Sequence, residues 1–166
     1  MGFGRCAADA IDDALLSVRS GFQAIALTTA LTVSGCASTH ILRDFATDGC
    51  SFFPDGDAEN PERWHDCCVT HDMAYWRGGT AEERETADVA LRDCVAARTG
   101  RQTLANQMYR GVRIGGVPLL PTGFRWGYGW GYGRGYEPLS SDEQQQADEK
   151  LATYRLDRAR YSCEKK

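Results

Sequence analysis

The segment WHDCCVTHDMAYW, residues 64–76, carries side chains that could do chemistry on a helix whose pattern should face a core. His71, Asp72 and Tyr75 share one face of that helix with the two adjacent cysteines, because they lie three or four positions apart. A carboxylate moved out of water costs several kcal/mol unless it is paired or coordinated, and a buried histidine needs partners for both ring nitrogens. This face could therefore provide a base with an anionic ligand beside it.

A second acidic residue, Asp88, falls on the apolar stripe of the following segment. Two antiparallel helices packed on these stripes would bring Asp88 close to His71. Asp88 could then accept a hydrogen bond from one imidazole nitrogen and leave the other as a base of fixed tautomer. Tyr75, one turn beyond His71, could donate its hydroxyl to Asp88, and Asp72 would be available to face a cation.

Turn and capping signals bound the helices that would position these residues. Residues 48–61 have the composition of a loop, rich in Gly, Pro, Asp and Asn. Asn60 is a candidate N-cap and Pro61 a candidate first helical residue. We therefore expect a first helix over residues 61–77, closed by the glycine pair that follows it.

The second helix should begin at a capping box formed by Thr80 and Glu83 and continue to about residue 99. A weaker third helix fits residues 102–112, and no segment shows the period-two alternation of a strand. The sequence thus predicts a mainly α-helical, disulfide-stapled domain over residues 48–136. We expect two antiparallel core helices, an upstream loop and a Gly/aromatic-rich segment in it, followed by a polar helical tail over 137–166.

Length, charge and cysteine content limit the class of protein. The 166 residues suit a single domain, and a net charge of −4 provides no basic footprint for nucleic acid. Seven cysteines in so short a chain are explained if the protein is exported, because thiols then form disulfides.

An export signal precedes the domain. Arg19 and the apolar run 24–33 match the n-region and h-region of a signal peptide, and the run is too short to span a bilayer. Val33-Ser34-Gly35-Cys36 resembles the bacterial lipobox, which implies a signal region over 1–35, a lipidated Cys36 and a tether over 36–47. The expected localisation is that of a membrane-anchored lipoprotein at the outer membrane or cell surface. The alternative is a buried helix with a chance cysteine.

Residues 1–17 do not fit in front of a signal peptide, because they carry three aspartates where the n-region should be positive. One hypothesis is that translation starts at Val18 and that residues 1–17 are not translated. Mass spectrometry of the unprocessed precursor tests this, since peptides from residues 1–17 would rule the hypothesis out.

Residues 66–75, DCCVTHDMAY, are similar to the active-site helix of secreted phospholipase A2, whose pattern is C-C-x-x-H-D followed by a tyrosine. In that family a later helix carries an aspartate six residues before a cysteine, and Asp88 and Cys94 repeat this spacing. The family's calcium loop has a cysteine upstream of the first helix, and Gly49-Cys50-Ser51 occupies that place. The resemblance covers residues 48–98, about a third of the chain.

The resemblance implies a hydrolase that acts on glycerophospholipids. His71 would be the general base that takes a proton from water, and this water would attack the sn-2 ester. Asp88 would orient His71 and stabilise its imidazolium, with Tyr75 as support. No G-x-S-x-G elbow occurs in the chain, so no serine nucleophile is expected.

The same resemblance implies a calcium ion bound by Asp72 and by backbone carbonyls of the loop, Gly49 and Ser51 among them. A loop N–H near Gly49 would complete an oxyanion site. The loop holds fewer glycines than that of the family, so Asp55 or Asp57 could supply a side-chain oxygen instead.

The four cysteines of this region allow three connectivities. The family pattern implies the pairs Cys50–Cys68 and Cys67–Cys94. The family's further cysteine before the tyrosine is an alanine here, which leaves Cys163 either free or paired between molecules.

Two other interpretations are open. The same clamped helices could form a non-catalytic lipid-binding or envelope-associated lipoprotein, although such a scaffold gains nothing from a base beside a carboxylate. Cys50, Cys67, Cys68 and His71 could instead bind a structural zinc ion, but adjacent cysteines on one helix point about 100° apart and do not converge easily on one metal.

Residues 124–136, FRWGYGWGYGRGY, alternate glycine with aromatic residues or arginine. Tryptophan and tyrosine favour the membrane–water interface and arginine suits phosphate, so Trp126 and Trp130 are candidates for contact with a membrane surface. The alternative is a glycine-rich loop that folds onto its own domain and fills gaps with its rings.

Overall fold

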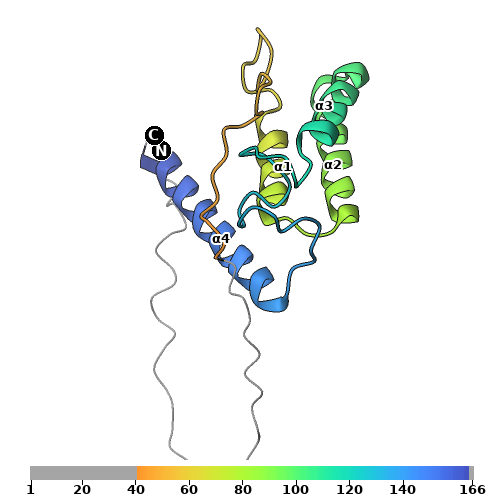
Figure 1. Ribbon diagram of the computed structural model, residues 1–166. Helices are drawn as coiled ribbons and strands as arrows, with labels where there is room; N and C mark the ends of the chain where they lie inside the picture. The colour runs from red at the N-terminus through yellow and green to blue at the C-terminus, as the bar shows by residue number, and fades with distance from the viewer. Residues whose placement is uncertain (1–40, 165–166) are drawn as a thin grey trace, which may run out of the picture. The chain divides into compact units, whose positions relative to one another are not determined.

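The computed structural model describes residues 41–164, so the signal region, the lipidation site Cys36 and the start of the expected tether lie outside the described residues. Within that range the helices are α1 (His65–Arg77), α2 (Ala81–Thr99), α3 (Gln102–Gly115) and α4 (Ser141–Glu164), drawn in Figure 1. No strand occurs among residues 41–164, and the predicted mainly α-helical class is confirmed. None of the described helices has the length and apolarity needed to cross a membrane.

The chain divides into two compact units. Of the described residues, 41–155 belong to one unit and 156–164 to the other. Residues 156–164 are the part of the second unit that the structure describes, and they form the last turns of α4. Apart from the disulfide bond of Cys163, every contact described below lies within the first unit.

The helix α1 begins at His65 rather than at residue 61. The Asn60 carbonyl accepts hydrogen bonds from the N–H groups of Asp57 and Arg63, while the Trp64 N–H donates to the carbonyl of Asp55. The residues between Asn60 and His65 therefore form turns, and the prediction that Asn60 caps the helix is wrong. The predicted end is confirmed, because the glycine after Arg77 closes the last turn.

The helix α2 begins where its sequence predicts. The Thr80 side chain accepts from the Glu83 N–H and the Glu83 carboxylate accepts from the Thr80 N–H, which completes the capping box. The helices α1 and α2 lie side by side and antiparallel (Figure 1). A disulfide joins Cys67 to Cys94 near one end, and His71 meets Asp88 further along.

The helix α3 ends three residues beyond the predicted residue 112, at Gly115, and packs against α2. The three helices and the loop before α1 enclose one apolar cluster. Its buried members are Cys50, Trp64, Cys67, Cys68, Leu91, Val95, Ala105 and Met108.

Both disulfides implied by the family pattern are present, Cys50–Cys68 and Cys67–Cys94. They tie the loop to α1 and α1 to α2, and each is typically worth about 2–4 kcal/mol. Cys163 is disulfide-bonded as well, so the expectation of a free thiol there is wrong.

The Gly/aromatic segment forms the cap of the C-terminal end of α1. The last carbonyls of a helix have no partner inside it. Here the N–H groups of Gly127 and Gly129 donate to Tyr75 and Trp76, and the indole N–H of Trp130 donates to Arg77. Glycine is required because these backbones touch.

Trp126 and Trp130 are therefore not membrane contacts, and that prediction is wrong. Trp126 is 2% exposed and Trp130 is 0% exposed. The indole N–H of Trp126 donates to the Gly79 carbonyl, 2.8 Å away. The alternative interpretation, a loop folded onto its own domain, describes these rings.

A second apolar cluster lies at the far end of α1. Leu42 and Phe45, from the second half of the expected tether, pack there with residues of α1, the Gly/aromatic segment and α4. The first turns of α4 are therefore partly buried rather than fully solvated. The buried members are Leu42, Phe45, Trp76, Trp130, Ala147 and Leu151.

Candidate active site

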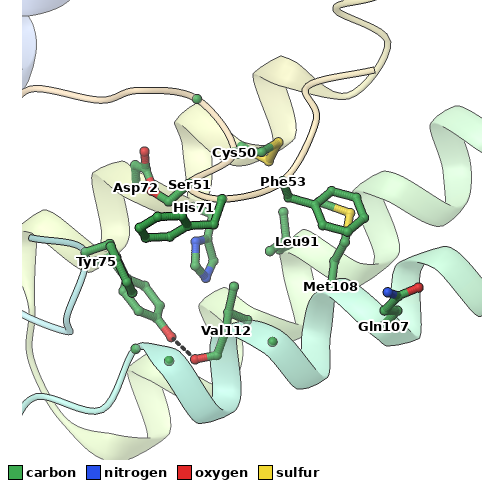
Figure 2. Close-up of a pocket in the computed structure, with 17 residues that line it drawn as sticks. Cys50, Ser51, Phe53, His71, Asp72, Tyr75, Leu91, Gln107, Met108 and Val112 are labelled. Carbon is green, nitrogen blue, oxygen red and sulfur yellow. Dashed lines mark hydrogen bonds between the residues drawn. A yellow bond between two sulfur atoms is a disulfide. The ribbon is translucent and has the colours of Figure 1, made fainter. Parts of the chain in front are cut away.

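A cavity of about 400 Å³ lies between α1, α3 and the loop before α1 (Figure 2). Most of its wall is apolar, with Phe52 and Phe53 from the loop and Met108 and Val112 from α3. His71, Asp72 and Tyr75 enter it from α1. We call this cavity the slot.

The structure brings together the three residues that the sequence predicts as base, orienting carboxylate and support. His71 Nε2 lies 2.8 Å from Asp88 Oδ1, and the Tyr75 hydroxyl lies 2.8 Å from the same oxygen. Asp88 is 0% exposed and His71 is 8% exposed.

The hydrogen bonds that Asp88 accepts keep its carboxyl group ionised. Burial alone would raise the pKa of Asp88, but hydrogen bonds from His71, Arg113 and Tyr75 outweigh burial and hold that pKa below its ordinary value. An ionised carboxylate can only accept hydrogen bonds, so His71 Nε2 carries the proton. In the neutral imidazole His71 Nδ1 then bears the lone pair, and it makes no hydrogen bond within residues 41–164. This is an oriented base.

Two arginines neutralise the buried carboxylate. Arg113 Nη1 lies 2.8 Å from Asp88 Oδ2, and Arg84 Nε lies 3.8 Å from the same oxygen. Arg84 is itself 2% exposed and satisfies its donors on Tyr75, on Tyr136 and on two carbonyls at the end of α3. A buried charge is tolerated only when it is paired and hydrogen-bonded, and this cluster meets both conditions.

Tyr75 is held as a hydrogen-bond donor. Burial and the nearby charge of Asp88 raise the pKa of its hydroxyl well above the ordinary value, so the phenol stays protonated. Arg84 donates to the phenol oxygen, and the single phenol proton faces two acceptors, Asp88 Oδ1 at 2.8 Å and the Val112 carbonyl at 3.3 Å. Gly116 passes so close to the ring that a Cβ there would lie 2.3 Å from it.

Asp72 lies at the junction of the slot and a second, more polar pocket that also contains Asp48 and Ser51. Burial raises the pKa of Asp72 to about 7, opposed by a hydrogen bond from Thr47 and reinforced by the charges of Asp48 and Asp55. Thr47 Oγ1 lies 2.5 Å from Asp72 Oδ2. A carboxylate in such surroundings gains from a cation.

The loop before α1 uses most of its polar groups to hold its own shape. The Gly49 N–H donates to Thr47 and the Cys50 N–H donates to Asp55, whose carboxylate also meets His65. Gly49 has a φ of 80°, and a Cβ there would lie 2.4 Å from Asp55 Oδ1. Only glycine fits this position.

These bonds show which polar groups of the loop are already engaged. The Gly49 N–H is occupied, so an oxyanion donor near Gly49 would have to be another N–H of the loop. The neighbouring Ser51 N–H makes no hydrogen bond within residues 41–164. Asp57 accepts from the Asn60 N–H on one oxygen and pairs with Arg63 on the other, whereas both contacts of Asp55 are made by its Oδ1.

The donor set nevertheless suits a hard cation. Calcium prefers several oxygen ligands, often a carboxylate combined with backbone carbonyls. Asp72, Asp48, Thr47 and Ser51 supply oxygens around one pocket. Residues 41–164 contain no cluster of three or more His, Cys, Asp or Glu side chains that could hold a metal, so such a site would depend on backbone oxygens. The zinc alternative is excluded, because Cys50, Cys67 and Cys68 are all in disulfides.

Sequence reasoning missed Arg84, Arg113 and Thr47. Arg84 could have been identified from the sequence as a partner of Asp88, since it lies four residues before Asp88 on the stripe that continues to Leu91. Arg113 and Thr47 could not have been identified, because only tertiary packing brings them to Asp88 and Asp72.

No family model, curated protein or solved structure matches this chain. Its class is that of a small, disulfide-stapled helical domain with a buried histidine–aspartate pair beside an apolar slot. Its disulfides are typical of an oxidising compartment.

Proposed function

We propose that the protein is a phospholipase A2-like hydrolase that cleaves the sn-2 ester of glycerophospholipids. The observation that carries the proposal is the His71–Asp88–Tyr75 constellation in the wall of an apolar slot. A buried base held by an ionised carboxylate is costly for folding and useful for proton transfer. The apolar wall would accept an acyl chain.

In this proposal a water molecule binds to His71 Nδ1. The water oxygen attacks the ester carbonyl while its proton moves to Nδ1, and Asp88 stabilises the imidazolium that forms. The tetrahedral intermediate then collapses, the bond to the glycerol oxygen breaks, and the imidazolium returns its proton to that oxygen. Fatty acid and lysophospholipid leave, and neutral His71 is restored.

Asp72 with oxygens of the loop would hold calcium. When bound, the ion supplies Lewis-acid stabilisation of the developing oxyanion and a contact for the substrate phosphate. With the Gly49 N–H occupied, the Ser51 N–H is the loop donor that we assign to the oxyanion.

Export and anchoring at Cys36 remain part of the proposal. They rest on the apolar run and lipobox-like sequence, which lie outside the described residues. The disulfides agree with an oxidising compartment.

Hydrolysis of phospholipid vesicles by the full chain tests the function, with calcium, with chelator, and with His71→Asn. We expect lysophospholipid release that falls on the order of 100-fold or more in the variant and with chelator. Thermal unfolding of the variant checks that it is folded. Vesicle binding by the unmodified protein without any release would favour the non-catalytic lipid-binding lipoprotein instead.

Contact with a lipid surface is better assigned to the mouth of the slot than to the buried tryptophans. Phe52 is 94% exposed, has a φ of 56°, and packs edge-to-face on Phe124 at the mouth. A positive φ is uncommon outside glycine and clusters at functional sites. We expect Phe52→Ser to reduce hydrolysis of vesicles several-fold more than it reduces hydrolysis of monomeric short-chain substrate. Equal loss on both substrates would contradict a role at the lipid surface.

A further inference from the structure

Arg113, near the end of α3, makes the most direct contact with the side of Asp88 that faces away from the histidine. Its Nη1 lies 2.8 Å from Asp88 Oδ2, and it lies 3.1 Å from Glu85 Oε2. His71 and Tyr75 both bind the other oxygen, Oδ1. The two oxygens of one carboxylate therefore meet different helices, α1 through Oδ1 and α3 through Oδ2.

The remaining charged and titratable neighbours of Asp88 do not replace this contact. Arg84 on α2 is 3.8 Å from Oδ2, and its donors are committed to Tyr75, Tyr136 and the carbonyls of Val112 and Arg113. Glu85 on α2 binds Arg113 and accepts a hydrogen bond from Tyr109 on α3. Among residues 41–164, Arg113 makes the only hydrogen bond to Asp88 Oδ2.

We propose that Arg113 is a positioning residue for the His71–Asp88 pair. A carboxylate held at one oxygen can rotate about its Cβ–Cγ bond, whereas one held at both oxygens has a fixed plane. Arg113 fixes that plane, so that Oδ1 stays aligned with the Nε2–H of His71. The expected effect on kcat rests on the proposed function. The fixed plane of the Asp88 carboxylate rests on the geometry alone.

The position of Arg113 also links the pair to the slot. Val112, the residue before it, lines the cavity, as does Met108 one turn earlier. The ion pair between Arg113 and Asp88 thus holds the α3 wall near His71, together with the hydrogen bonds of Arg84 to the Val112 and Arg113 carbonyls. Partners that orient a metal-ligating histidine typically contribute about 10-fold to 100-fold to metal affinity or activity, and for Arg113, which acts on His71 through Asp88, we take the lower end of that range.

Arg92 provides a matched control. Its side chain is 32% exposed, as is that of Arg113, and it lies on α2 with its ion pair to Asp93, away from the slot. Arg92→Gln removes the same charge from a similarly exposed site. Arg113→Lys retains the cation at the site.

Steady-state kinetics of the full chain on monomeric short-chain phospholipid test the proposal. We expect Arg113→Gln to lower kcat about tenfold with little change in KM, and Arg113→Lys to recover most of that loss. Arg92→Gln should leave both constants unchanged. Wild-type kcat in Arg113→Gln, or an equal effect of Arg92→Gln, would overturn the proposal.

A measurement that does not need turnover separates this inference from the proposed function. The Nε2–H proton of His71, hydrogen-bonded to Asp88, should give a sharp downfield proton NMR signal in the wild type and in Arg113→Lys, and a broadened or lost one in Arg113→Gln. A retained sharp signal in Arg113→Gln overturns the positioning role. If the signal is sharp in the wild type and broadened or lost in Arg113→Gln, but the wild type hydrolyses no phospholipid, the proposed function fails and the positioning role stands.

A readout on the wild type covers the case in which Arg113→Gln does not fold. Nitrogen-15 NMR of the arginine side chains should show hindered rotation of the Arg113 guanidinium and faster rotation for Arg92. Rotation of Arg113 as fast as that of Arg92 overturns the proposal.

Discussion

Asp88 organises the candidate site at the scale of single residues. One buried carboxylate accepts from an imidazole and a phenol on one oxygen and from a guanidinium on the other. Each donor lowers the cost of burying the charge, and the charge in turn selects the tautomer of His71. The stability of the fold and the tautomer of His71 therefore both depend on the two carboxylate oxygens of Asp88.

Replacing Asp88 with asparagine tests this dependence. The amide can donate to His71 Nε2 through its NH₂ group, which would favour the tautomer that carries its proton on Nδ1 and has no lone pair there for water. We expect kcat to fall on the order of 100-fold to 10,000-fold in Asp88→Asn. Steady-state kinetics measure this, and circular dichroism checks the fold. A loss below about threefold in folded protein would show that Asp88 does not set the tautomer.

Asp72 should make the stability of the metal-free protein depend on pH. Its pKa is about 7 in the folded state against 3.8 for an ordinary aspartate, so the folded state binds the proton more tightly. The metal-free protein therefore gains stability as the pH falls from about 7 to about 4, and the ionised carboxylate destabilises it above that window. Binding of a cation should weaken over the same fall in pH.

Asp72→Asn should remove this dependence. In chelator at pH 8 we expect the variant to be more stable than the wild type by about 2–4 kcal/mol, and the difference should vanish below about pH 4. Urea unfolding at both pH values provides the free energies. Equal stability of the two proteins at pH 8 would contradict the raised pKa.

The Gly/aromatic segment and α1 depend on each other at the scale of elements. Backbone and indole N–H groups of residues 127–130 bind the carbonyls that the end of α1 leaves without partners. Glycine permits the close approach, and tryptophan adds buried area together with a donor. The alternation of the two residue types thus follows from a helix cap rather than from a lipid surface.

Trp130→Phe tests the contribution of the indole N–H donor separately from that of a buried aromatic ring. The variant keeps an aromatic ring at a fully buried site but leaves the Arg77 carbonyl without its partner, 2.6 Å away in the wild type. We expect a loss of about 1–3 kcal/mol in the free energy of unfolding. Tyr132→Phe, which removes an exposed hydroxyl bonded to the Leu119 carbonyl, is the control and should change stability little. Equal effects would refute the capping role.

Two apolar clusters hold the first unit together at the scale of the whole molecule. One surrounds the disulfides between the loop, α1, α2 and α3, and the other gathers residues 42–45, the end of α1 and the start of α4. Trp76, on α1, belongs to the second cluster while Cys67 and Cys68 belong to the first, so α1 is common to both. The site lies on the helix that the two clusters share.

The contribution of α4 to the free energy of unfolding can be tested at Leu151 and Leu156, two leucines on the same helix. Leu151 is 6% exposed within the second cluster, whereas Leu156 is 61% exposed. We expect Leu151→Ala to lower the free energy of unfolding by about 2–4 kcal/mol and Leu156→Ala to change it by less than about 0.5 kcal/mol. Chemical denaturation measures both. A neutral Leu151→Ala would mean that α4 is not part of the cooperative unit.

Much of the helical framework could be predicted from local patterns. The capping box of Thr80 and Glu83 places the start of α2, and the glycine pair after Arg77 ends α1. The start of α1 could not be predicted in the same way, because the Trp64 N–H bonds to Asp55 instead of to Asn60. Local signals identify which groups can cap a helix, but competing partners decide whether they do.

Helical periodicity by itself places His71 and Tyr75 on one stripe and Asp88 on the next, so that two antiparallel helices bring these groups together, and the Cys67–Cys94 disulfide holds the two stripes in register. Only the tertiary structure decided what neutralises Asp88, which loop N–H groups are occupied, and that the tryptophans of the Gly/aromatic segment are buried. The physical reason is that the two kinds of interaction act over different distances along the chain. Periodicity acts within a helix, whereas the partner of a buried charge is whichever group the packing of distant segments brings within hydrogen-bond distance.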